Sequence, residues 1–374
     1  MKIVFPNYQN SIMNVSNSIL KNYGITPKYS SIPFLDEQLS KNYNHIIYIL
    51  LDGMGVNIIK KFLKKDDALK KFMAKEITSV FPPTTVAATN AVLSGVPPIV
   101  NGHLGWVQYF EKEDIDLIVF QNTDFYNNEN IPKEDLRAKY LSYKRLGEQI
   151  KAKNPDIITN EFFPSFIENG SNSFKEEIEK VLLVTHNTDK SFNYLYWTQP
   201  DLVQHQTGIY SNDTKTILTD LNQDFTELIE NIDDDTIVIC IADHGLTNIK
   251  PLSLFENKEL MALLKRRPSI EPRALNFFVK DAALKRFKTL FNQAYSKYYK
   301  LYSKDEILAS KLFGDGEKHQ LIDVFLGDYI AIAINKYMFS LNNEKSYLAH
   351  HAGTSEDEMI VPLIIYSKKQ DLLS

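Results

Sequence analysis

The chain has 374 residues, which is longer than one typical domain, so we expect one large core with an inserted module. Hydrophobic residues make up 44% of the sequence and charged residues 24%, as in an ordinary soluble globular protein. The formal net charge of -5 argues against a stable complex with nucleic acid and against binding to an anionic membrane surface.

Residues 1–40 predict a polar lead-in before the core. Within them, Ile12, Val15 and Ile19 have the spacing of a helix, which Gly24 ends. The N-terminus lacks the long apolar stretch of a secretory signal, and no run reaches the roughly 18 apolar residues of a membrane span. We therefore expect a cytoplasmic protein without a membrane partner.

Four later apolar runs predict strands, and polar side chains follow each of them. IIYILL precedes Asp52, ITSVF precedes the turn PPTT, YLYW precedes the turn before Asp201, and TIVICIA precedes Asp243 and His244. Uninterrupted apolar runs are typical of strands buried on both faces of a parallel sheet. Ligands bind beyond the carboxyl ends of such strands, so we expect these polar clusters to meet at one edge of the sheet.

The remaining core elements fit the same architecture. Leu218, Leu221 and Phe225 have the spacing of an amphipathic helix, placed between YLYW and TIVICIA as a crossover between parallel strands. Apolar runs at residues 328–334 and 361–367 predict late strands. The fold class that we expect is α/β, with a mostly parallel central sheet flanked by helices.

A change in residue composition marks the inserted module. At residues 247–326 aromatic residues and lysines alternate, and this stretch separates the turn at Asp243 from the histidines near the C-terminus. We expect it to form a smaller α+β cap beside the edge of the sheet. The catalytic core would then comprise residues 1–246 and 327–374.

Two of the polar clusters contain a carboxylate and an imidazole at short spacing. Asp243 and His244 adjoin at a strand end, where both can reach one cation; the alternative is a capped strand end with a hydrogen-bonded histidine. Asp201 and His205 are four residues apart and share one face of a helix, although two surface residues would have the same spacing. Such ligand sets favour Zn²⁺, Mn²⁺ or Fe over Ca²⁺, which prefers oxygen ligands alone.

Two further clusters complete the pattern. Thr84 and Thr85 begin a helix of small residues, where free N–H groups favour an anion such as phosphate, although a threonine there is usually an N-cap. It acts as a nucleophile only when a metal or a base activates it. His350 and His351 lie on a glycine-containing loop before the last strand, and we expect one of them to bind a metal.

Taken together, these clusters resemble the alkaline phosphatase superfamily, specifically its nucleotide pyrophosphatase/phosphodiesterase branch. The matching pieces span residues 46–366 in the family's order: LLDGMG, FPPTTVAATNAVLSG, PDLVQH, ADHG and HAGTSEDEMIVPLI. The resemblance implies an alkaline-phosphatase-like fold, two divalent metal ions that are Zn²⁺ or alternatively Mn²⁺, and Thr85 as the nucleophile.

The resemblance also implies that seven side chains bind the two metals, in two sets. The metal that activates the nucleophile is bound by Thr85, Asp52, Asp243 and His244. The second metal is bound by Asp201, His205 and His351. His351 is preferred to His350 because it keeps the family's spacing to Glu358.

The sequence departs from the family where the substrate is bound. Asn101 replaces a histidine that often precedes the glycine after the nucleophile helix, and Trp106 stands where an asparagine often holds a phosphate oxygen. We expect Asn101, Trp106 and the cap residue Arg273 to contact the substrate. Three other basic residues of the cap can hold a distal phosphate or be solvated: Arg266, Arg267 and Lys318.

The implied activity is hydrolysis of phosphodiester or phosphoanhydride bonds through a phospho-threonine, with a small diester or a nucleotide as substrate. No arginine near Thr85 matches the pattern of the monoesterases, which favours diesters. A phosphomonoesterase or a phosphonate hydrolase with the same metals is the alternative enzyme, and an inactive metal-binding scaffold is the alternative from another class. The sequence does not indicate an oligomeric state.

Overall fold

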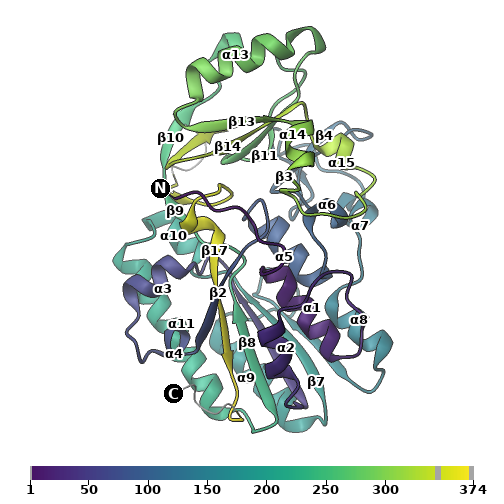
Figure 1. The fold of residues 1–374 in the computed structure, drawn as a ribbon, viewed down its shortest axis with the longest axis vertical. Coiled ribbons are helices and arrows are strands. Elements are labelled where there is room, and N and C mark those ends of the chain that lie inside the picture. Colours follow the sequence, from purple (N-terminus) through teal and green to yellow (C-terminus); the bar gives the residue numbers. More distant parts are fainter. Residues whose placement is uncertain (1, 342–346, 370–374) are drawn as a thin grey trace.

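The computed structural model describes residues 2–341 and 347–369. The chain forms two lobes, each built around one large sheet (Figure 1). The sheet of the core lobe has six strands, which are in spatial order β2 (Met73–Thr78), β17 (Ile360–Tyr366), β8 (Thr236–Ile241), β1 (His45–Leu51), β7 (Ser191–Trp197) and β6 (Ile158–Phe162).

The core sheet is mostly parallel, as predicted. β1 pairs with β8 and β7 in parallel, and β6 pairs with β7 in the same way. Every residue of β1 and β8 is buried, which explains their uninterrupted apolar sequences. β17 is antiparallel to both β8 and β2, so β2 runs in the same direction as the other strands and its carboxyl end reaches the same edge.

Helices cover both sides of this sheet (Figure 1). One group consists of α1 (Ile12–Asn22), α2 (Pro33–Leu39), α5 (Thr85–Ser94) and α8 (Leu146–Lys153). The other group consists of α3 (Val56–Phe62), α4 (Ala68–Lys71), α9 (Phe174–Asn187) and α11 (Asn212–Asn231). α11 is the predicted crossover helix, and it buries Leu218, Leu221 and Phe225.

The N-terminal segment differs from the prediction of a polar lead-in. All nine residues from Ile12 to Leu20 are buried, because α1 packs between α2, α5 and α8. Its polar side chains form hydrogen bonds with neighbouring segments of the protein. The Ser16 hydroxyl donates to the main-chain oxygen of Val92, and the Asn17 amide donates to that of Gly95. Hydrogen bonds of this kind offset the free-energy cost of burying a polar helix face, so the segment belongs to the core.

The second lobe contains an antiparallel sheet of seven strands. In spatial order they are β13 (Tyr299–Ser303), β14 (Tyr329–Ala333), β12 (Ala274–Phe277), β11 (Ser269–Glu271), β3 (Val107–Phe110), β4 (Ile115–Ile118) and β5 (Thr123–Asp124). The cap predicted at residues 247–326 therefore contributes only three of these strands. The other four come from segments predicted as core. β14 pairs with β12 and β13, whereas β3, β4 and β5 join the sheet through the single pair Ile270–Val107 between β11 and β3.

Short elements complete the two lobes. Those beside the second sheet are α6 (Pro98–Asn101), α7 (Leu136–Tyr140), α12 (Lys258–Met261), η1 (Asp281–Ala283), α13 (Leu284–Tyr295), α14 (Lys304–Ala309) and α15 (Ile322–Phe325). Those near the junction are β9 (Thr247–Asn248), β10 (Lys250–Ser253), β15 (Tyr337–Ser340), β16 (Ala349–His350), α10 (Asp201–Thr207) and α16 (Glu356–Met359). Across the described residues, no helix has the length and apolarity needed to span a membrane.

Candidate active site

The predicted polar clusters meet at the carboxyl edge of the core sheet. Asp52 directly follows β1, and Asp201 begins α10 four residues after the end of β7. Asp243 and His244 follow β8. The parallel register pairs the last residue of β1 with Trp197 at the end of β7, so these strands end level with one another. The main-chain N–H of Asp201 then donates to the Asp52 main-chain oxygen at 2.9 Å, which holds the two turns together.

Two groups of side chains at this edge have the geometry of metal sites. In the first, ligand atoms of Asp52, Asp243 and His244 all lie within 4.8 Å of one another. In the second, the same limit holds for Asp201, His244 and His351. His205 lies beside the second group, with its Nε2 atom 3.3 Å from Asp201 Oδ1. The structure thus brings the predicted ligands together, and it adds that His244 faces both groups.

The carboxylates of the first group repel one another, and a bound cation would offset this repulsion. Burial raises the pKa of Asp52 well above its usual range, and the negative charges of Asp243 and Asp201 raise it further. Burial also raises the pKa of Asp243. Asp52 Oδ1 and Asp243 Oδ2 are buried and accept no hydrogen bond from any described residue. Buried carboxylate oxygens without donors fit a site built for a divalent cation.

The histidines of the second group are suited to the same purpose. Burial lowers the pKa of His351 well below its usual range, and the neighbouring His244 and His350 lower it further. A neutral imidazole is the form that binds a metal. The rings of His244 and His351 stack with centroids 4.0 Å apart. His205 Nδ1 lies 2.8 Å from the main-chain oxygen of Ala349, a contact that leaves Nε2 directed at Asp201.

Thr85 is the hydroxyl that faces these groups. It is the first residue of α5, and its Oγ1 atom lies 3.3 Å from Asp52 Oδ2 and 3.3 Å from His244 Nε2. Thr84 occupies the N-cap position but makes no capping hydrogen bond. Its hydroxyl donates instead to Glu271 of the second lobe at 2.6 Å. The two adjacent threonines therefore point to different partners, and only Thr85 contacts the candidate metal ligands.

A cavity of about 640 Å³ opens above Thr85 between the two lobes. Its floor includes Asp201, His205 and His351. Its upper wall is largely apolar and aromatic, and is formed by Trp106, Val107, Phe125, Ile270, Pro272, Met338, Phe339 and Leu341. Glu271 is the carboxylate of this wall, and burial raises its pKa to about 7. A cavity with a polar floor and an aromatic wall is suited to a small molecule with one ionic end.

Of the three residues predicted to contact the substrate, only Trp106 lines the cavity among its described residues. Trp106 lines the cavity, and its main-chain N–H donates to Glu271 at 2.8 Å. Asn101 does not line it, since its buried amide donates to Ser94 and to the main-chain oxygen of Val96. The prediction for Asn101 is therefore corrected: the side chain closes the turn after α5.

The prediction for Arg273 is corrected as well. Its side chain is fully buried and forms an ion pair with Glu358 at 2.7 Å, so its guanidinium is not available to a substrate. The other basic residues of the cap do not line the cavity either. Arg266 pairs with Asp116 at 3.0 Å, and Lys318 is exposed beside Asp323.

Two residues of the site were not predicted. Tyr196 of β7 donates a short hydrogen bond to Asp52 Oδ2 and so orients a candidate ligand. In the sequence it is one aromatic residue of an apolar strand, without a sign of a polar partner. Glu271 lies in the cap, where no motif points to it. Only the packing of the second lobe against the first brings it to Thr84.

The chain is similar to one family of known proteins. The family model described as type I phosphodiesterase/nucleotide pyrophosphatase matches residues 46–355. Murine ectonucleotide pyrophosphatase/phosphodiesterase 5, as an inactive threonine-to-alanine variant in complex with AMP, is similar in fold with a TM-score of 0.66 at 14% identity. The alignment covers 87% of this chain and 88% of that one.

The human ectonucleotide pyrophosphatase/phosphodiesterase 5 aligns with a TM-score of 0.64 at 14% identity, over 86% of this chain and 88% of that one. No curated protein sequence matches. The family match extends over most of the chain and contains every candidate ligand and Thr85. The chain therefore belongs to the type I phosphodiesterase/nucleotide pyrophosphatase family, and it is a hydrolase of phosphodiester bonds.

Proposed function

We propose that this hydrolase uses two divalent metal ions and cleaves its substrate through a phospho-threonine formed on Thr85. The observation that carries the proposal is the position of Thr85 Oγ1, 3.3 Å from both Asp52 Oδ2 and His244 Nε2. A hydroxyl reacts as a nucleophile only when its surroundings take up its proton or stabilise its anion. Among the hydroxyls of the described cavity lining, that of Thr85 lies beside carboxylate and imidazole ligands.

The metals would be held by the two groups described above: Asp52, Asp243 and His244 for one, and Asp201 and His351 with the adjacent His205 for the other, with His244 also facing this second group. When bound, such ions lower the pKa of the attacking hydroxyl and neutralise charge on the transferred phosphoryl group. Oxygen and nitrogen donors of this kind fit Zn²⁺ or Mn²⁺.

Side chains and main-chain groups of the protein supply the nucleophile, favour the phosphoryl charge and orient a metal ligand. The oxygen of Thr85 bonds to phosphorus as the bond to the leaving oxygen breaks, and the leaving group departs with a proton. Water then cleaves the phospho-threonine, which for a diester still carries the remaining ester group, and this step restores the hydroxyl of Thr85. The first turn of α5 has main-chain N–H groups without partners in the helix, and these favour the negative charge of the phosphoryl group beside Thr85. Asp52 is kept in place by the hydroxyl of Tyr196.

The cavity supports a nucleotide as substrate. Trp106, Phe125 and Phe339 offer aromatic surfaces near the candidate metal ligands, and the described lining contains no lysine or arginine. Aromatic walls favour a flat apolar group, such as a nucleobase, at the far end of the substrate. A structural neighbour was solved in complex with AMP.

The cytoplasmic location of the protein stays a prediction from the sequence.

A substrate panel tests the proposed function. The metal-loaded protein is expected to cleave the nitrophenyl ester of a nucleoside 5′-monophosphate faster than bis-nitrophenyl phosphate, because the first places a base on the aromatic wall. Both diesters should be cleaved at least about tenfold faster than nitrophenyl phosphate and phosphonoacetate, a difference of roughly 1.4 kcal/mol in barrier. A preference for the monoester or the phosphonate would contradict the proposal.

A second prediction concerns the pH dependence of substrate binding. Because the pKa of Glu271 lies at about 7, raising the pH from 6 to 8 adds a negative charge to a cavity that receives an anion. KM for a diester is therefore expected to rise about three- to tenfold over this range through charge repulsion. Replacing Glu271 by glutamine should abolish the rise, which steady-state kinetics at constant ionic strength would measure.

The matched control is Glu177→Gln. Glu177 is a buried glutamate of α9 whose pKa is raised to about 8 by burial, and it does not line the cavity. Its substitution should leave the pH dependence of KM unchanged. The prediction is contradicted if Glu271→Gln keeps the full rise in KM between pH 6 and pH 8.

A further inference from the structure

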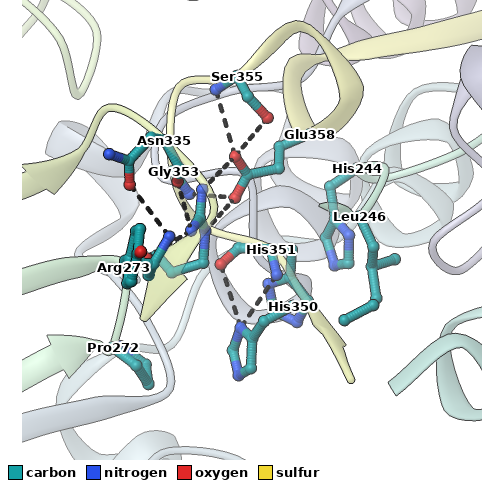
Figure 2. A network of polar contacts seen from close by, with 12 residues as sticks. His244, Leu246, Pro272, Arg273, Asn335, His350, His351, Gly353, Ser355 and Glu358 are labelled. Carbon is teal, nitrogen blue, oxygen red and sulfur yellow. Dashed lines mark hydrogen bonds and ion pairs between the residues drawn. The ribbon is translucent and has the colours of Figure 1, made fainter. Parts of the chain in front are cut away.

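A fully buried ion pair joins the second lobe to the loop that carries His351 (Figure 2). Arg273 lies between β11 and β12, and its Nε and Nη2 atoms donate to the two carboxylate oxygens of Glu358 at 2.7 and 2.8 Å. Its Nη1 atom donates to the main-chain oxygens of Asn335 and Tyr337 at 2.9 and 2.7 Å. All three nitrogens of the guanidinium are thus committed within the protein.

Glu358 in turn holds the loop from residue 350 to residue 355. Its Oε1 atom accepts from the N–H of Gly353 at 2.8 Å, and its Oε2 atom accepts from the N–H of Ser355 at 3.2 Å. Ala352 has a φ of +83°, which residues with a side chain rarely adopt. Its N–H donates to the main-chain oxygen of Pro83. The loop is therefore held in an unfavourable backbone conformation by contacts from outside it.

The carboxylate and the main chain of Glu358 serve different parts of the site. The carboxylate binds Gly353, two residues after His351. The main-chain oxygen accepts from the N–H of Gly245 at 2.9 Å, next to His244. Loss of the ion pair would release the loop of His351, whereas the contact to Gly245 does not depend on the charge of the side chain.

We propose that Arg273 and Glu358 form a positioning unit that fixes His351 for the second metal, an inference that rests on the proposed function. A buried ion pair adds little net stability compared with apolar residues of similar volume, so stability alone is a weak reason for it. A guanidinium fork does fix the orientation of a carboxylate, which an ammonium cannot do. Residues that orient metal ligands typically change metal affinity by about 10–100-fold when replaced.

The test is Zn²⁺ binding by the metal-stripped full-length chain, measured by competition with a chromophoric chelator. Arg273→Lys keeps the positive charge but loses the fork. One of the two sites is expected to weaken by about 10–100-fold while the other keeps its affinity. With Co²⁺ as the probe, the absorption bands of one site only should change. Arg286→Lys is the matched control, because Arg286 forms an exposed pair with Glu259 on α13.

Gly353→Ala provides a second variant in case Arg273→Lys does not fold. A Cβ atom at Gly353 would lie 2.8 Å from Arg273 Nη2 and 2.9 Å from both oxygens of Glu358, so it displaces the loop without removing a charge. The same selective loss of one site is expected. Unchanged affinity at both sites, or equal weakening of both, overturns the positioning role alone. Fewer than two sites in the unmodified chain overturn the proposed function, and this inference with it.

Discussion

Replacing Thr85 by alanine is expected to lower kcat for a nucleotide diester by about 10⁴-fold or more, in the range seen when a covalent nucleophile is removed from other hydrolases. The reason is that Thr85 Oγ1 is the hydroxyl within 3.3 Å of both Asp52 and His244, and alanine removes the attacking oxygen. The metal content should stay close to that of the unmodified chain, since the carboxylates and imidazoles are untouched. Steady-state kinetics and elemental analysis of the same sample measure both quantities.

Thr84→Ala is the matched control for this variant. Thr84 donates to Glu271 and contacts no candidate ligand, so its loss should change KM more than kcat, and by less than about tenfold. A slowly cleaved diester should trap the phosphoryl group, still esterified to its remaining alcohol, on Thr85, and fragmentation of the labelled peptide can locate it. Label on Thr84, or similar losses of kcat in both variants, would show that the nucleophile has been assigned to the wrong residue.

The core sheet could be predicted from the sequence because its elements carry local signals. A strand buried on both faces is an apolar run such as Thr236–Ile241, and a parallel sheet places the residues after such runs at one edge. Asp52 and Asp243 follow these runs directly and Asp201 follows after a short turn, so their convergence required only the correct strand direction. Thr85 was distinguishable from Thr84 through family resemblance, and the structure supplies the physical reason in the two different hydrogen-bond partners.

The second lobe was less predictable because its sheet depends on contacts between distant segments. Its strand β11 has three residues and meets β3 through a single pair across 163 positions in the sequence, Ile270 with Val107. Arg273 was misjudged for the same reason. Whether an arginine lies in a cavity or in a buried ion pair depends on its partner, and Glu358 lies 85 positions after Arg273. Neither separation leaves a periodic pattern that a single sequence can show.

His244→Ala is expected to remove both metals and to lower turnover by at least about 10³-fold. Bound metals stabilise the charge of the transition state by several kcal/mol, and each loss of about 1.36 kcal/mol slows the reaction tenfold. His244 is the one residue shared by both candidate ligand groups, and its Nε2 atom lies 3.3 Å from Asp243 Oδ2 and 3.5 Å from Asp52 Oδ1. Replacing His351, which belongs to one group, should remove a single metal. Elemental analysis after dialysis against buffered Zn²⁺ distinguishes the two results.

The control for a lost buried imidazole is His103→Ala. His103 is fully buried, does not line the cavity, and belongs to neither ligand group, so this variant should bind both metals even if it unfolds at a lower temperature. Metal content is therefore compared among His244→Ala, His351→Ala and His103→Ala below their unfolding temperatures. Two bound Zn²⁺ ions in His244→Ala would show that His244 is not shared between the sites. Loss of metal in His103→Ala would mean that any cavity in the fold disturbs binding, and that the effect of His244→Ala is not specific to a ligand.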